Sequence, residues 1–221
     1  MKYKVLLLSF AALASCSAGI SHEAGTLNTG KALRSDVNLH VRQDQSDTNK
    51  AAGLVQKLGS NDEAEREQAK KEIRSLLGES AESREQVLQE LIKLVEKSDT
   101  GLRFSSKAHY DAWSFAVGLL GELKATESLN ALVACIECND GVAGLSFDGY
   151  PVLRAVIEIG PPAVPKLTEA LSDARPATRK YAALALGEIG GDDAKKALQS
   201  ALLSEQDKEV ATTIRIALRL K

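Results

Sequence analysis

The chain has 221 residues, and its 28 lysine and arginine residues against 30 aspartate and glutamate residues give a formal net charge of −2. This balance excludes the strongly basic surface that binds a nucleic-acid backbone. Hydrophobic residues make up 44% of the chain, enough for the roughly 175 residues after residue 46 to bury one continuous core. We therefore expect a folded domain with no nucleic-acid partner.

The N-terminus has the pattern of a bacterial export signal. Lys2 and Lys4 flank the start of the apolar run VLLLSFAALA, which is too short to span a bilayer. The letters LASC then end at Cys16 and resemble a bacterial lipobox. That resemblance implies a lipoprotein signal peptide over residues 1–15 and a lipid on Cys16, which becomes the first mature residue.

The resemblance also implies an address. Ser17 follows the cysteine, in place of the aspartate that retains enterobacterial lipoproteins in the inner membrane. This favours a lipid anchor at the bacterial cell envelope, on the periplasmic face of the outer membrane. The alternative is ordinary cleavage after Ala14 or Ala18, which gives a soluble exported protein.

Residues 16–46 have the composition of a linker. They are rich in Gly, Ser, Thr, Asn and Asp, and they show no sustained apolar period. A polar segment of this kind cannot bury enough apolar surface to fold. We expect a disordered, flexible tether with an end-to-end distance of roughly 30 Å.

The rest of the chain carries a repeat. The segments AVGLLGELKATESLNALVACI (116–136), AVIEIGPPAVPKLTEAL (155–171) and ALALGEIGGDDAKKALQSALL (183–203) follow one pattern with a period near 30 residues. Each copy has a short apolar helix, a turn with Gly or Pro, and a second helix. This predicts an all-α fold over residues 47–221, a right-handed α-solenoid of about four to five helix pairs.

One copy matches a known family pattern. Residues 173–203 resemble the HEAT-like repeats of the phycobilisome lyase type, in which an aspartate, a proline, an arginine and two alanines precede Leu-Gly-x-Ile-Gly. The matching positions are Asp173, Pro176, Arg179, Ala182, Ala183, Leu186, Gly187, Ile189 and Gly190. The other copies drift, because Trp113 stands in place of Arg179 and Ile157 in place of Gly187. The resemblance implies a HEAT-like solenoid and a binding function, without an activity.

Two further cysteines follow the first repeat. Cys135 and Cys138 form a Cys-x-x-Cys pair where the second helix of that copy should end. In an oxidising compartment the natural interpretation is a disulfide. A reduced pair, or a redox or metal role, is the alternative, although a redox motif would open a helix after a strand.

Aromatic residues gather around an insertion in the repeat. Six of the seven after residue 16 lie between residues 104 and 150, beside the insertion CNDGVAGLSFDGY. We predict a protein-binding surface formed by Trp113, Phe147 and Tyr150, since exposed aromatic residues beside an irregular loop are typical of interface hot spots. The alternative is that Trp113 and Phe115 fill the core of an atypical repeat.

These patterns predict a non-catalytic protein-binding module without cofactor or metal, whose partner is another envelope or periplasmic protein. The runner-up is an enzyme or enzyme subunit related to HEAT-like bilin lyases or di-iron hydroxylases. The His22-Glu23 pair resembles the His-Glu pairs of deoxyhypusine hydroxylase, but no second such pair exists in the chain.

Overall fold

The structure is a computed structural model that describes residues 50–97, 106–138 and 149–219. The chain divides into two units, Met1–His40 and Val41–Lys221, and all described residues belong to the second. They form helices and turns without a β-strand. The expected all-α solenoid is therefore confirmed, whereas Cys16, Phe147 and the tether lie outside the described residues.

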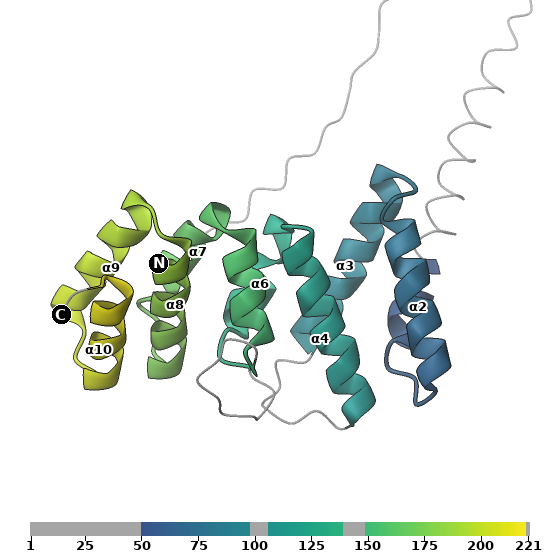
Figure 1. The fold of residues 1–221 in the computed structure, drawn as a ribbon, viewed down its shortest axis with the longest axis horizontal. Helices are drawn as coiled ribbons and strands as arrows, with labels where there is room; N and C mark the ends of the chain where they lie inside the picture. Colours follow the sequence, from purple (N-terminus) through teal and green to yellow (C-terminus); the bar gives the residue numbers. More distant parts are fainter. Residues whose placement is uncertain (1–49, 98–105, 139–148, 220–221) are drawn as a thin grey trace, which may run out of the picture. The chain divides into compact units, whose positions relative to one another are not determined.

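The helices follow one another with short turns (Figure 1). Residues 50–57 are helical, and the later elements are α2 (Glu63–Leu76), α3 (Ala81–Lys97), α4 (Lys107–Glu122), η1 (Thr126–Ser128), α5 (Leu129–Ala134), α6 (Pro151–Ile159), η3 (Pro161–Ala163), α7 (Val164–Ala170), α8 (Pro176–Ile189), α9 (Asp192–Ser204) and α10 (Lys208–Ala217).

The helices of the second unit form two rows. The first row contains α2, α4, α6, α8 and α10, and the second contains α3, α5, α7 and α9 (Figure 1). Within the rows α4 packs on α6, α6 on α8, and α8 on α10, while α3, α5, α7 and α9 contact one another in order. The apolar side chains between the rows form one continuous core, as expected for stacked repeats.

Three helices of the first row begin after a polar residue whose side chain caps the helix. Asp62, Ser106 and Asp207 accept hydrogen bonds from backbone N–H groups at the starts of α2, α4 and α10, which stabilises a helix by about 1 kcal/mol each. In contrast, α8 begins with Pro176, and the side chain of the preceding Arg175 caps no backbone N–H group. Its missing N–H makes proline well suited to this position.

The arginine of the repeat pattern ties neighbouring repeats together. Arg179 donates from Nε and Nη2 to both carboxylate oxygens of Glu205, at 2.8 and 2.9 Å, and from Nη1 to the carbonyl of Asp173 at 2.9 Å. Both charged groups are largely buried, with 16% and 6% of their side chains exposed. The hydrogen bond from Arg179 lowers the pKa of Glu205, so the pair is ionised at neutral pH.

Two glycines set the spacing of the first row. A Cβ atom on Gly121 of α4 would lie 2.8 Å from Cα of Ala155 in α6, and one on Gly187 of α8 would lie 2.8 Å from Cβ of Ala217 in α10. Real Cβ atoms do not approach other atoms so closely. The glycines therefore allow α4 to lie against α6 and α8 against α10.

The spacing loosens where the glycine is missing. Ile157 of α6 occupies the position that Gly121 and Gly187 occupy in their repeats, and α6 approaches α8 less extensively than it approaches α4. The first row therefore contains both close and wide helix pairs.

Among the described helices, none is both long and apolar enough to cross a membrane.

We predict that alanine at the two glycines of α4 has opposite effects. Gly121→Ala should destabilise the protein by about 1–3 kcal/mol, because its methyl group meets the α6 backbone. Gly118→Ala, the matched control, has nothing within 4 Å of the added carbon and should stabilise by roughly 0.5–1 kcal/mol through helix propensity. Chemical denaturation measures both, and equal effects of the two substitutions would show that α4 and α6 do not touch at Gly121.

Candidate functional site

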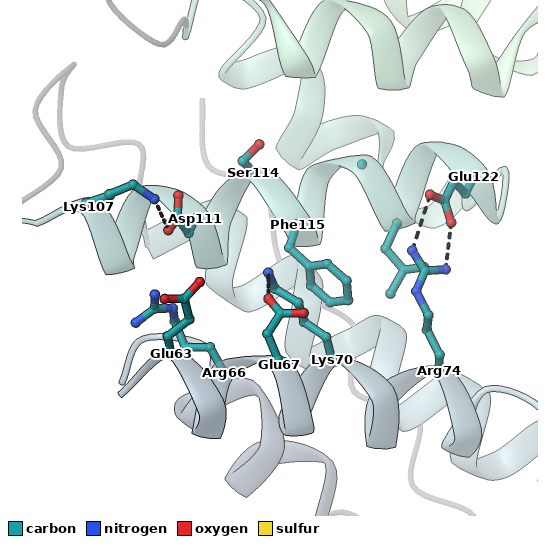
Figure 2. Close-up of a pocket in the computed structure, with 12 residues that line it drawn as sticks. Glu63, Arg66, Glu67, Lys70, Arg74, Lys107, Asp111, Ser114, Phe115 and Glu122 are labelled. Atoms are coloured by element: carbon teal, nitrogen blue, oxygen red, sulfur yellow. Dashed lines mark hydrogen bonds and ion pairs between the residues drawn. The ribbon is translucent and has the colours of Figure 1, made fainter. Parts of the chain in front are cut away.

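The candidate site is a groove between α2 and α4 with a volume of about 540 Å³. It follows the two helices where they face each other in the first row, and Figure 2 shows its side chains. The lining residues are Glu63, Arg66, Glu67, Lys70 and Arg74 from α2, and Lys107, Asp111, Ser114, Phe115, Gly118, Leu119 and Glu122 from α4. A volume of this size is in the range of ordinary binding sites.

Long side chains lie between α2 and α4, whereas a glycine lies at the contact between α4 and α6. Arg74 of α2 reaches Glu122 of α4, with 2.9 Å between Nη1 and Oε2, and both side chains are about half exposed. The hydrogen bond from Arg74 to Glu122 raises the pKa of the arginine. An exposed pair of this kind adds little stability, but it spans the distance between α2 and α4 at one end of the groove.

An aromatic ring forms the floor of the groove. Phe115 is partly buried against the core, and Nζ of Lys70 and Cζ of Arg74 each lie 5.6 Å from the centre of its ring. Both distances are within the range of cation–π attraction. Figure 2 shows the ring pointing from α4 toward α2. Leu119, which also lines the groove, is 2% exposed, so the apolar surface at the middle of the groove comes mainly from Phe115.

Carboxylates face each other at the end of the groove where both helices begin. In Figure 2 the carboxyl groups of Glu63 and Asp111 lie on opposite walls. Asp111 accepts a hydrogen bond from Lys107 at 2.6 Å, and the lysine side chain is 85% exposed. Arg66 instead donates to the carbonyl of Ser60 at 2.8 Å. This end of the groove therefore carries two carboxylates and two cations.

The charges of the middle are paired within α2. Glu67 accepts a hydrogen bond from Lys70 at 2.7 Å, and that bond lowers the pKa of the Glu67 carboxyl. On the opposite wall Ser114 and Gly118 are small, and a Cβ atom on Gly118 would meet nothing within 4 Å. The α4 wall is thus open at its centre, and a ligand backbone could lie against it.

The structure places the predicted aromatic residues in different environments. Trp113 is fully buried, with its ring 5.9 Å from that of Tyr110, so the prediction of a binding role is corrected in favour of the core. Tyr150 is partly buried, and its ring lies 5.1 Å from that of Tyr181 on α8. Burial, together with a hydrogen bond to Tyr150, raises the pKa of Tyr181. The structure does not bring Trp113 and Tyr150 into one exposed surface.

The cysteine pair lies at the end of α5. Cys135 and Cys138 are joined by a disulfide, and Cys135 is buried. Between them Glu137 accepts a hydrogen bond from Nη1 of Arg175 at 2.7 Å. The turn that the disulfide closes therefore also holds the residue before α8.

No group of three or more His, Cys, Asp or Glu side chains among the described residues could hold a metal ion.

The groove is a feature that the sequence pattern does not predict. The pattern assigns Phe115 to the core or to the aromatic cluster, and for residues 47–100 it predicts amphipathic helices without a site. The sequence contains one weak signal for the groove. Lys70 and Arg74 have long charged side chains, and both lie on the side of α2 that faces α4.

Part of the chain matches a known family. Residues 151–219 match HEAT repeats, which covers α6 to α10, while no curated protein is significantly similar to the chain. An engineered protein of known crystal structure is 20% identical over 76% of this chain and 77% of its own, with a TM-score of 0.39. A designed armadillo repeat protein is 16% identical over 76% and 98%, with a TM-score of 0.25.

Proposed function

We propose that this HEAT-like repeat protein is a non-catalytic protein-interaction module and that it binds its partner in the groove between α2 and α4. The observation that carries the proposal is the partly buried ring of Phe115 on the floor of an open groove with charged walls. Solenoids present extended surfaces of this kind. Aromatic and arginine side chains are enriched where interfaces gain most of their binding energy.

The charges of the groove favour a polypeptide over a nucleic acid. Its walls carry the four cations Arg66, Lys70, Arg74 and Lys107 and the four carboxylates Glu63, Glu67, Asp111 and Glu122. A phosphate backbone needs an excess of cations. An alternation of both signs around an aromatic floor instead matches the polar rim and apolar centre of a protein interface.

We further propose that a lipid on Cys16 anchors the protein at the bacterial cell envelope, on the periplasmic face of the outer membrane, where it binds another envelope or periplasmic protein. The support is the LASC sequence after the apolar run and a Cys135–Cys138 disulfide, which suits an oxidising compartment. Residues 16–46 would then act as the tether between lipid and solenoid.

A second contact region is proposed at the insertion before α6. Tyr150 lies at the start of that helix, and Phe147 precedes it in the chain. Both aromatic residues belong to the repeat that departs most from the period of 30.

The alternative function is an enzyme or enzyme subunit related to bilin lyases or di-iron hydroxylases. It rests on the repeat type alone, and no site among the described residues favours it.

Lipidation of Cys16 predicts that the protein is found in the membrane fraction of cells and that loss of this cysteine moves it to the soluble fraction. Wild-type protein should sediment with membranes and be released by detergent, whereas Cys16→Ser should lose the anchor, because lipid chains provide firm membrane attachment. Fractionation of cells that express each form measures this. Equal release of both forms as soluble, processed protein would exclude a lipid at Cys16.

The interaction function predicts position-specific crosslinking. A photo-reactive residue at Ser114, in the groove, should crosslink one defined protein in intact cells, and the same residue at Gln89, which is exposed on α3, should not. The crosslink should disappear with Phe115→Ala in a protein whose circular dichroism is unchanged. Identical crosslinking from both positions, or none from Ser114, would contradict binding in the groove.

A further inference from the structure

The last helix of the first row has one side that is exposed along its whole length. α10 contacts α8 and α9 and buries Val210 and Ile214 against them. Figure 1 shows α10 at one end of the row. Four exposed residues recur at helical spacing on the side away from these contacts and are called the basic stripe: Lys208, Thr212, Arg215 and Arg219.

The three cations of the basic stripe have no ion pair among the described residues, because the nearby carboxylates are engaged elsewhere. Glu205 pairs with Arg179, and Glu209 pairs with Lys180 of α8. Asp207 caps α10 by accepting from backbone N–H groups. The exposed side of α10 therefore carries three positive charges and no carboxylate to balance them.

Folding accounts for only part of this charge. Arg215 and Arg219 lie near the end of α10, where the helix dipole favours cations. Lys208 is its first residue, where the dipole disfavours a positive charge. The other described lysines without an ion pair are scattered over the structure, at Lys71, Lys97, Lys124 and Lys195. A cluster of three such cations is therefore a particular feature of α10.

An exposed apolar side chain lies beside the basic stripe. Ile216 follows Arg215 directly and is four residues from Thr212, and 63% of its surface is exposed. Among the described residues only Leu203 is a large apolar residue with comparable exposure. Apolar contact at the centre and charges around it are the usual composition of a protein interface.

From these observations we infer that the basic stripe and Ile216 bind an acidic segment of a partner protein, a second interaction surface beside the groove between α2 and α4. Carboxylates of the segment pair with the three cations, and an apolar side chain covers Ile216. The two arginines suit this role, because a guanidinium group can bind a carboxylate through two parallel hydrogen bonds. The stripe from Lys208 to Arg219 extends over about 16 Å, which requires several acidic residues in the segment.

A protein segment fits this surface better than the other anionic partners. One exposed apolar side chain is too little for a helix that inserts into a membrane surface. A nucleic acid would be repelled by the rest of the chain, whose formal net charge is −2. A second copy that packed its α10 symmetrically on this one would bring like charges together.

Fluorescence anisotropy on the full chain tests the charge requirement. The probe is a short labelled peptide with several glutamates around one leucine in a background of serine and glycine, and its control has glutamines in place of the glutamates. The glutamate peptide should bind at least about tenfold more tightly at low salt, and added salt should remove most of this difference. Equal binding of the two peptides would overturn the inference.

Variants of α10 locate the bound peptide. Lys208→Gln, Arg215→Gln and Arg219→Gln together should weaken binding at least about tenfold without a change in circular dichroism, because all three side chains are exposed. The matched control removes the same charge from three other helices, with Lys71→Gln, Lys97→Gln and Lys195→Gln. It should change binding by no more than about twofold. Equal effects of the two triple variants would show that the peptide responds to net charge alone and would overturn the site.

The apolar contact is tested separately. Ile216→Ser should weaken binding of the glutamate peptide by about three- to tenfold and leave its salt dependence as in the wild type, since no charge is removed. The exposure of Ile216 means that the substitution should leave the fold intact. Unchanged affinity would overturn the role of Ile216 in the surface.

Crosslinking in cells separates this surface from the groove. A photo-reactive residue at Thr212 should crosslink a protein in intact cells, and the three glutamine substitutions on α10 should remove that crosslink. It should persist with Phe115→Ala, which removes the crosslink from Ser114. A Thr212 crosslink without one from Ser114 would contradict binding in the groove and support the second surface. Absence of a Thr212 crosslink, or its loss with Phe115→Ala, would overturn a second surface.

Other occupants of the surface give different results. Vesicles that contain phosphatidylglycerol, or a short DNA duplex, would overturn the inference if they bound more tightly than the glutamate peptide and lost binding with the three glutamine substitutions. Concentration-dependent dimerisation that these substitutions abolish would overturn it as well, because a second copy of the chain would then cover α10.

Discussion

The distance between neighbouring helices of the first row is the constraint on which the site depends. Gly121 and Gly187 remove the side chains that would keep α4 from α6 and α8 from α10. Between α2 and α4 the facing positions carry Arg74 and Phe115 instead. The same stacking plan thus produces a closed contact where glycine is present and an open groove where a cation and a ring are present.

This arrangement separates stability from binding along the chain. The buried Arg179–Glu205 pair and the continuous core hold the last repeats together, and a pair of this kind is costly to break on one side. The charged pairs of the groove are mostly exposed, and pairs of that kind contribute little to folding. Side chains such as Lys107 and Asp111 can therefore exchange their contact for those of a partner at small cost.

The repeat could be predicted from sequence because its period and its turn residues are local signals. The match of residues 173–203 to the repeat pattern correctly places α8 and α9, and Arg179 takes part in the contact between repeats. The groove could not be predicted, because Trp113 and Phe115 are two positions apart on one helix and point to different sides. Whether Phe115 lies in the core or borders a groove depends on how far α2 lies from α4, and that distance involves side chains far away in sequence.

The proposed site requires that α4 be open to solvent on the side that faces α2. The most direct test is the rate at which a thiol reagent labels Gly118→Cys and Val117→Cys in native protein with Cys16→Ser and the disulfide intact. We predict that Gly118→Cys is labelled in the native protein, since a Cβ atom added there meets nothing within 4 Å, and that the fully buried Val117→Cys is labelled only on unfolding. Equal protection of both thiols would mean that α2 closes over α4 and that the groove does not exist.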